Sequence, residues 1–278
     1  TASGLFSVYS NTTGLDTTAI GVRALYSNTT GILNTASGVD ALYYNIESYN
    51  TAYGSAALYL TTTSQYNTAI GYAAGNSFNN GYNNVFLGAN TDVNGAGYFN
   101  VVAVGQSTIA TASNQARIGN GATNSIGGFA NWTNFSDGRY KKNVKEDVKG
   151  LDFIMKLRPV TYNLNVSGLS AKLDESRGAE MIEQMKTAMA DKEKIIQSGF
   201  IAQEVEQAAK ELGYDFSGVD APKNDTDFYG LRYAEFTVPL VKAVQELYKE
   251  NTELTARVAA LEAMVKSLVE DRSPTKQR

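Results

Sequence analysis

A glycine recurs at nearly constant spacing through the first 105 residues of the chain. Successive spacings are 17, 17, 16, 17, 17 and 17 residues, for Gly4, Gly21, Gly38, Gly54, Gly71, Gly88 and Gly105. A small or apolar residue stands two positions before each glycine: Ala2, Ala19, Ala36, Ala52, Ala69, Phe86 and Ala103. A fixed period with a fixed apolar phase indicates stacked units, each too short to bury a core by itself.

The composition of these repeats argues against helix. Gly, Asn and Thr are poor helix formers, and Asn-Thr-Thr-Gly at 11–14 and 28–31 is typical of a turn. A repeat of this length fits two short strands and two turns, with small Ala and Gly residues facing a narrow interior. The alternative is a disordered Gly/Asn-rich linker. A linker, however, has no reason to keep a glycine register over seven units, so we expect a β-solenoid over 1–119.

The repeat phrase Asn67-Thr-Ala-Ile-Gly71 resembles the head repeats of trimeric autotransporter adhesins and of related phage and bacterial fibre proteins. The resemblance covers 1–119 and implies a β-roll or β-helix with three chains around one axis. Gln115–Gly119 is similar to a last, shortened repeat, and 120–135 then resemble a neck.

Charge divides the chain near residue 135. The first 135 residues contain two basic and four acidic side chains, whereas the last 143 contain 22 basic and 24 acidic ones. So large a shift marks a domain boundary. The net charge of −4 argues against a nucleic-acid binder, and no apolar run reaches the roughly 20 residues of a membrane span. Because the chain starts at Thr1 rather than Met, we expect a fragment of a longer protein.

The chain contains no histidine and no cysteine. This excludes a Ser-His-Asp or Cys-His mechanism, a Cys/His zinc site and disulfides. No calcium loop, phosphate-binding loop or dinucleotide fingerprint is present, so we expect no metal and no cofactor. Any catalysis must therefore use Ser, Thr, Tyr, Lys, Asp or Glu.

A serine and a lysine stand close together at the predicted domain boundary. Ser136-Asp-Gly is typical of a turn, and a turn followed by an extended piece can bring the Lys141 amine back to the Ser136 hydroxyl. A lysine can act as base for serine when burial or a neighbouring cation, here Arg139 or Lys142, lowers its pKa. On residue types alone, a capping turn beside a solvated basic run explains the same pattern.

The sequence around and beyond this pair resembles the intramolecular chaperone domain of endosialidase tailspikes and phage tail fibres. The similar blocks are Ser136–Val144, Gly150-Leu151, Leu157–Tyr162, Gly199–Val205, Tyr233–Phe236 and Ala243–Leu247, in the family order over 136–250. The resemblance implies that the domain helps the upstream fibre to trimerise and then releases itself by cutting the Phe135–Ser136 bond. Ser136 would be the nucleophile and Lys141 the base. It also suggests the backbone N–H of Gly199 or Phe200 as the oxyanion donor.

This chaperone domain is expected over 136–235, with an insertion at 166–197. The insertion is charged and mostly helical in pattern, with Met181, Met185 and Met189 four residues apart. An amphipathic helix with a methionine core stripe explains it, and a partner-binding helix is the alternative. The predicted fold class is therefore a trimeric β-solenoid followed by an α+β domain and a C-terminal parallel coiled coil.

The coiled coil is expected over 236–272, before a tail at 273–278. Its seam alternates Leu at d with Val or Asn at a: Leu240, Val244, Leu247, Asn251, Leu254, Val258, Leu261, Val265 and Leu268. One amphipathic helix packed on its own domain is the alternative. Val at a with Leu at d favours two strands in isolated peptides. We expect three, because a short coiled coil takes the symmetry of the larger body fused to it.

Two alternatives to a self-cleaving trimeric fibre or adhesin stay open. The chaperone domain could be an uncleaved, permanent cap. The fibre could also bind carbohydrate, since 11 of the 17 tyrosines lie in the first 135 residues, although repeat packing explains them equally well. The expected partners are two further copies of the chain and, outside the trimer, a host-surface glycan or a protein receptor. The expected location is a phage tail or virion, or a bacterial extracellular appendage or cell surface.

Overall fold

The computed structural model describes residues 1–175 and 183–271, which form two compact units. The first unit holds Thr1–Trp132, Thr161–Gln197 and Pro222–Phe228; the second holds Thr133–Val160, Ser198–Ala221 and the chain from Tyr229 on. Met181 of the predicted methionine stripe, residue 272 of the predicted coiled coil and the predicted tail 273–278 lie outside the described residues.

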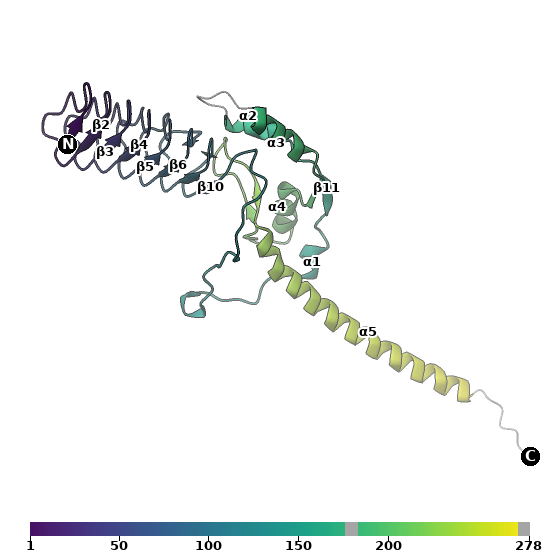
Figure 1. The fold of residues 1–278 in the computed structure, drawn as a ribbon. Helices are drawn as coiled ribbons and strands as arrows, with labels where there is room; N and C mark the ends of the chain where they lie inside the picture. The colour runs from purple at the N-terminus through teal and green to yellow at the C-terminus, as the bar shows by residue number, and fades with distance from the viewer. Residues whose placement is uncertain (176–182, 272–278) are drawn as a thin grey trace, which may run out of the picture. The chain divides into compact units, whose positions relative to one another are not determined.

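The first unit is built on a solenoid whose turns stack one strand above the next (Figure 1). One parallel sheet contains β1 (Ala2–Ser3), β2 (Thr18–Ile20), β3 (Thr35–Ser37), β4 (Thr51–Tyr53), β5 (Thr68–Ile70), β6 (Val85–Leu87), β8 (Val102–Val104) and β10 (Ala116–Ile118). Each residue pairs with its counterpart one turn later, as Ala36 does with Ala52 and Ala52 with Ala69. The expected β-solenoid of about 17-residue turns is confirmed.

The middle residue of each inner strand points into the solenoid. Ala19, Ala36, Ala52, Ala69, Phe86 and Ala103 are fully buried. Leu25, Leu42 and Leu58 are fully buried in the same core. A three-residue strand exposes its outer positions and buries its middle one, because successive side chains alternate between the two faces. The alanines therefore face the interior as predicted.

The recurring glycines lie at a corner of the turn rather than in the interior. Gly54 has φ +134°, a backbone conformation open to glycine, and a Cβ there would lie 2.3 Å from the carbonyl oxygen of Gly71. The same close approach recurs between Gly38 and Gly54. The glycine period therefore reflects the direct stacking of one corner on the next.

The second strand expected in every repeat is mostly absent from the described turns. Leu25 N–H donates to the Ala41 oxygen at 3.0 Å, and Leu42 N–H to the Ala57 oxygen at 3.0 Å. These leucines have positive φ, which interrupts the extended backbone although the interturn hydrogen bonds continue. Only β7 (Asp92–Val93) and β9 (Ile109–Ala110) pair as a second strand in the described residues.

A ladder of buried asparagines runs through the solenoid beside the sheet. The Oδ1 atom of Asn34 accepts the N–H of Asn50 at 2.9 Å, Asn50 that of Asn67 at 3.0 Å, and Asn67 that of Asn84 at 3.1 Å. All four side chains are fully buried. The ladder satisfies backbone groups that the short strands leave unpaired.

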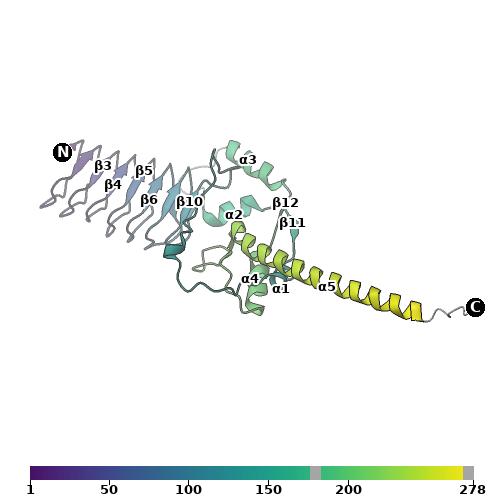
Figure 2. The same cartoon turned by 90° about the horizontal axis from the view of Figure 1, so that it is seen from below.

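Two helices complete the described elements of the first unit: α2 (Val166–Leu173) and α3 (Glu183–Glu193) (Figure 2). The Asn165 side chain caps α2 by accepting the Gly168 N–H at 2.7 Å. Met189 of α3 is buried and Met185 is half-buried. This part of the insertion is helical, with its methionines on the inner side.

The second unit has a small aromatic core. It contains η1 (Gly138–Tyr140), α1 (Leu151–Ile154), α4 (Ala202–Glu211), β13 (Val219–Asp220), β14 (Gly230–Leu231), η2 (Tyr233–Phe236) and α5 (Thr237–Asp271). A further two-stranded sheet pairs β11 (Val160–Tyr162) with β12 (Gln197–Gly199). The buried core residues are Phe153, Val205, Ala208, Ala209, Phe216 and Phe236. None of the helices within the described ranges has the length and apolar character needed to cross a membrane.

The long helix α5 is 35 residues and continues well beyond this core (Figure 1). Every residue from Leu247 through Glu270 is exposed in the single chain. A coiled coil and three-chain assembly stay predictions.

Candidate functional site

The Ser136 hydroxyl and the Lys141 amine meet across a short turn. Lys141 Nζ lies 2.9 Å from Ser136 Oγ and donates a hydrogen bond to it. The helix η1 separates the two residues along the chain, and Lys141 returns to an extended conformation directly after it, with φ −87° and ψ 132°. Its N–H donates to the Gly138 oxygen at 3.2 Å. The turn therefore brings together the two residues that the sequence assigns to a nucleophile and a base.

Asp137 and Arg139 hold this turn in place. The Asp137 carboxylate accepts the Arg139 backbone N–H at 2.9 Å and pairs with the guanidinium at 2.5 Å. The Arg139 guanidinium, and then its backbone N–H, lower the pKa of Asp137, so this carboxylate stays ionised. Because Arg139 is paired with Asp137, its charge is compensated. Its electrostatic effect on the Lys141 amine is therefore smaller than that of the unpaired cation considered from the sequence.

The site is open to solvent in the single chain. Ser136 and Lys141 are both exposed, and so is the Phe135 side chain on the other side of the predicted scissile bond. Phe129 and Trp132, earlier in the neck, are exposed as well. Three solvent-exposed aromatic side chains thus lie within the seven residues before the serine.

The predicted oxyanion donors lie in the same unit but are differently engaged. Gly199 is the last residue of β12. The Phe200 N–H donates to the Tyr233 hydroxyl at 3.1 Å, and its ring stacks on Phe236 at 5.3 Å. In residues 1–175 and 183–271, no hydrogen bond joins either amide to Ser136, whose side chain bonds with Lys141. The structure thus unites the serine and lysine but does not bring the oxyanion donors to them.

Two residues of this unit were not given roles from the sequence. Tyr233 binds the Phe200 amide, and Glu246 of α5 accepts the Leu151 N–H at 2.7 Å. Gly150 leaves room for this carboxylate, since a Cβ there would lie 2.3 Å from Glu246 Oε2. Both residues lie in blocks that carry the family resemblance, but a block assigns no partner to a residue.

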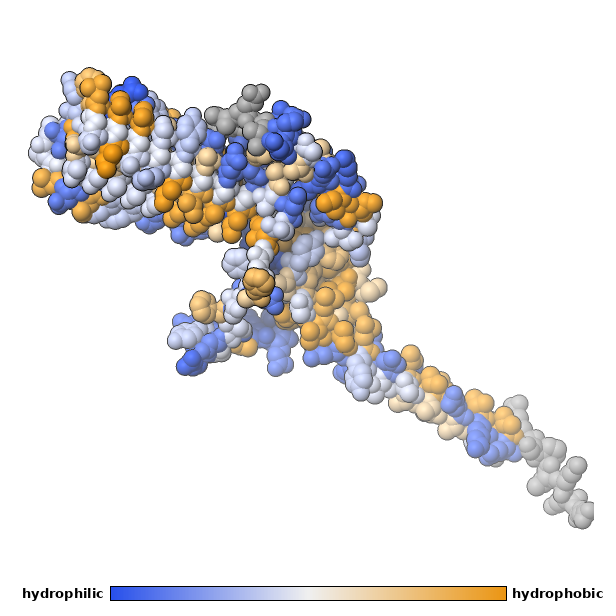
Figure 3. Space-filling view, in the orientation of Figure 1, coloured by the Kyte–Doolittle hydropathy of each residue, from blue (hydrophilic) through white to orange (hydrophobic). Residues whose placement is uncertain are grey.

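The predicted coiled-coil seam lies entirely on α5. Its exposed members are Leu240, Val244, Leu247, Asn251, Leu254, Val258, Leu261, Val265 and Leu268. Further apolar side chains flank the seam and are exposed too: Val241, Tyr248, Met264 and Val269. Apolar side chains thus follow one another along this exposed helix, where orange atoms lie in the space-filling view (Figure 3).

Comparison with known proteins gives one match. Residues 136–214 match the family described as the chaperone of endosialidase, so the match begins at the predicted serine nucleophile. No curated protein and no solved structure shows significant similarity to the chain. The chain therefore carries a chaperone-of-endosialidase domain, preceded by a β-solenoid of about 17-residue turns.

Proposed function

We propose that this chain belongs to a trimeric phage tail fibre or bacterial surface adhesin that processes itself. Its chaperone domain drives folding and trimerisation of the solenoid and then cuts the Phe135–Ser136 bond. The observation that carries the proposal is the 2.9 Å hydrogen bond between Lys141 and Ser136, at the first residue of the matched family segment.

The proposed reaction is a single-turnover proteolysis in cis. Ser136 Oγ attacks the Phe135 carbonyl carbon while a neutral Lys141 amine accepts the hydroxyl proton. Collapse of the tetrahedral intermediate breaks the C–N bond, and the lysine returns the proton to the Ser136 nitrogen. Water then hydrolyses the ester, leaving a carboxylate on Phe135 and a free α-amine on Ser136. Asp137 keeps the turn and takes no part in the proton transfer.

Assembly supplies what the exposed site lacks. A lysine base must be neutral, and desolvation favours the neutral amine. The bare side chains of Phe129, Trp132 and Phe135 offer apolar surface for a neighbouring chain to cover. Burial of this segment between chains would exclude water from the dyad and bring the oxyanion donors into place. Cleavage is therefore expected only after the chains have assembled.

Three chains fit α5 better than two. Apolar residues at the positions beside the a/d seam, such as Val241, Tyr248 and Val269, widen the stripe. A two-helix coiled coil usually places charged residues there and leaves such side chains in water. A third helix covers them. The three-fold symmetry implied by the repeat resemblance agrees with this wider seam.

Variants of the dyad test the cleavage. We expect Ser136→Ala and Lys141→Ala to remain as one intact band on a denaturing gel, while Lys142→Ala, a change of the adjacent lysine, is processed normally. Intact-mass spectrometry of the unaltered chain should show a new N-terminus at Ser136. Normal two-fragment processing in Ser136→Ala would refute the assignment. An unaltered chain that stays whole would favour the permanent cap.

Variants of α5 test the assembly. Leu254→Glu with Leu261→Glu places charges in the seam, and Ala256→Glu with Ala263→Glu places the same charges on the opposite face of the helix. The seam pair should lose the trimer in light scattering and should also lose cleavage, whereas the control pair should keep both. A seam variant that still cleaves as a monomer would contradict the requirement for assembly.

A further inference from the structure

The predicted cut would not separate the two compact units, although it lies close to the boundary between Trp132 and Thr133. Segments 161–197 and 222–228 follow Ser136 in the chain, yet both belong to the same unit as the solenoid. We call them the two clasp segments. If the bond before Ser136 is broken, both clasp segments lie on the C-terminal fragment, and their contacts with the solenoid become contacts between two fragments.

The shorter clasp segment is fixed to the last turn by Asp227. Its side chain is 2% exposed and lies 3.6 Å from the Arg117 guanidinium. The Thr111 hydroxyl donates to Asp227 at 2.5 Å, and the Gln115 amide donates at 3.2 Å. Asn224 adds a hydrogen bond from its side-chain amide to the Thr111 oxygen at 2.9 Å. A buried carboxylate with this set of donors is a specific contact, since removing its partners leaves a charge uncompensated.

The charge of Asp227 is stabilised by its neighbours. Burial alone would raise its pKa, but hydrogen bonds from Thr111, from the backbone amides of Lys223 and Phe228, and from Gln115 together hold the pKa below its ordinary value. The carboxylate is therefore ionised at neutral pH and binds the solenoid as an anion.

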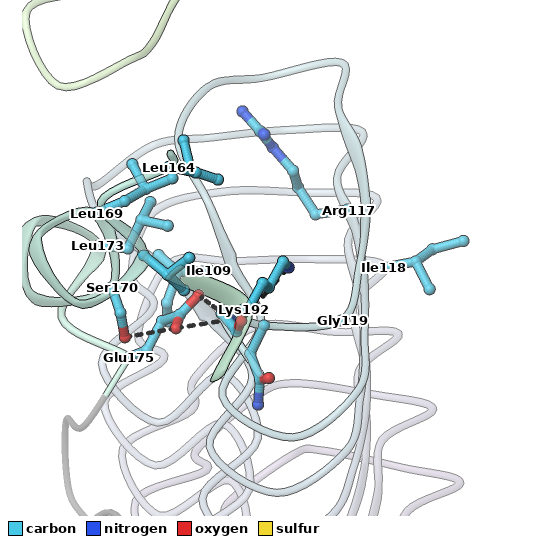
Figure 4. A pocket seen from close by; sticks show the side chains of 13 residues that line it. Ile109, Arg117, Ile118, Gly119, Leu164, Leu169, Ser170, Leu173, Glu175 and Lys192 are labelled. Atoms are coloured by element: carbon cyan, nitrogen blue, oxygen red, sulfur yellow. Dashed lines mark hydrogen bonds between the residues drawn. The ribbon is translucent and has the colours of Figure 1, made fainter. Parts of the chain in front are cut away.

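The longer clasp segment forms hydrogen bonds with Gly121 and Thr123, just after the solenoid. Glu175, which is 5% exposed, accepts the Gly121 N–H at 3.0 Å and the Ser170 hydroxyl at 2.6 Å (Figure 4). Lys192 Nζ donates to the Thr123 oxygen at 2.7 Å. Gly121 and Thr123 precede the predicted cut, whereas the other three residues follow it.

Apolar packing accompanies these polar contacts. A Cβ on Gly121 would lie 2.9 Å from Met189 and 3.3 Å from Val166, two buried residues of the longer clasp segment. Figure 4 shows Leu169 and Leu173 near Ile109 of the solenoid, around a cavity of about 200 Å³. The face of the last turn is thus covered by side chains from beyond the cut.

We propose that the fragment beginning at Ser136 stays bound to the solenoid after cleavage, as a non-covalent cap held by the two clasp segments, in place of the release that the resemblance implies. The proposal rests on the cleavage proposed above, but the contacts do not depend on the covalent bond at residue 135. Release would expose groups of the last turn that are now buried beside the clasp segments, among them Ile109 and Thr111. Terminal caps with a polar outer face keep solenoids soluble.

An engineered cut tests the retention separately from self-cleavage. A site for a specific protease is inserted between Gly127 and Gly128, which have no atom within 4 Å of where a Cβ would lie, in full-length Ser136→Ala protein. After complete digestion, we expect both fragments in one size-exclusion peak with the mass of the uncut assembly. Separate elution of the fragments at micromolar concentration would overturn the proposal. Self-cleavage of the unaltered chain is read from its own gel, so failure of either idea is distinguishable.

A matched pair of variants tests whether the clasp segments hold the cap. Asp227→Ala with Glu175→Ala should weaken retention of the cut fragments by roughly 100-fold, because the donors on Thr111, Gln115 and Gly121 lose their carboxylate acceptors. Asp225→Ala with Glu183→Ala, which changes exposed carboxylates in or beside the same segments, should retain the fragment. Retention that is unchanged in the first pair would show that other contacts hold the fragment and would overturn the assignment. If that pair fails to fold before digestion, Asp227→Asn with Glu175→Gln replaces it. Each amide keeps one acceptor oxygen but loses the charge, so retention should weaken by less, roughly 10-fold.

Discussion

Replacing Asn67 by alanine should destabilise the solenoid through two specific backbone groups. The Asn67 Oδ1 atom accepts the Asn84 N–H at 3.1 Å, and its Nδ2 donates to the Gly81 oxygen at 3.2 Å. Within residues 1–175 and 183–271, the Asn84 N–H and the Gly81 oxygen form no other hydrogen bond that could replace these. The Asn84 side-chain amide also loses its hydrogen bond to Asn67 Oδ1, but it keeps the one to the Tyr98 backbone oxygen at 3.0 Å. Asn50 Oδ1 keeps the Asn67 backbone N–H.

The expected magnitude follows from that inventory. A buried donor or acceptor left without a partner costs about 1–3 kcal/mol, so the two groups together cost about 2–6 kcal/mol. Amide exchange at Asn84 should accelerate at least ~30-fold, since about 2 kcal/mol corresponds to that factor. The thermal midpoint of the solenoid should fall as well.

Hydrogen–deuterium exchange on the Ser136→Ala chain measures this effect without interference from cleavage. Thr35→Ala is the control, because Thr35 follows the buried Asn34 of the same ladder but is itself exposed. The control should leave exchange and the thermal midpoint almost unchanged. If Asn67→Ala and Thr35→Ala alter exchange and melting equally, the asparagine ladder does not stabilise the turns and the reasoning is refuted.

Two further predictions concern the solenoid corner and its cap. Gly54→Ala should destabilise the solenoid by more than about 2 kcal/mol in thermal denaturation, because alanine is strained at φ +134° and its Cβ would meet the Gly71 oxygen. Retention of the cut fragment should be constant from pH 7 to 5 and weaken below about pH 4. The pKa of Asp227, which faces Arg117 and lies on one loop with Lys223, is below its ordinary value when the fragment is bound, so its contribution to retention is lost as the pH falls through that lowered pKa. Asp227→Asn should remove this acid dependence, as measured by size exclusion across the pH range.

Much of the solenoid could be predicted from its repeats. The spacing of Gly4, Gly21 and Gly38 gives the length of a turn, and the alanine two places earlier gives the inward phase. The missing second strand could not be read in the same way. Leu25 and Leu42 adopt positive φ because hydrogen bonds to the adjacent turns compensate the local cost, and no propensity scale for leucine anticipates that.

At the candidate site, contacts between residues close in the sequence could be predicted, whereas contacts between distant residues could not. Ser136 and Lys141 are five residues apart, so turn chemistry at Asp137 suffices to bring them together. The hydroxyl of Tyr233 reaches Phe200 from 33 residues away, and Asp227 reaches Thr111 from 116 residues away. Contacts of such separation depend on the packing of whole elements. A single sequence without aligned relatives offers no signal for them.

Because the solenoid turns resemble one another, their own side chains specify only weakly which turn stacks on which. Within the turns before Phe86, a slip of one turn would set Asn50 where Asn67 stands and Ala52 where Ala69 stands, so the ladder and the alanine positions would both be preserved there. Register is weakly specified wherever a shifted pairing buries the same residues. The contacts of Asp227 with the last turn, by contrast, use Arg117, a charged residue at the position where the earlier turns place Ala103, Phe86 or Ala69. A unique charge pair at one end distinguishes the last turn from its neighbours, and a cap that forms this pair can therefore fix which turn closes the solenoid.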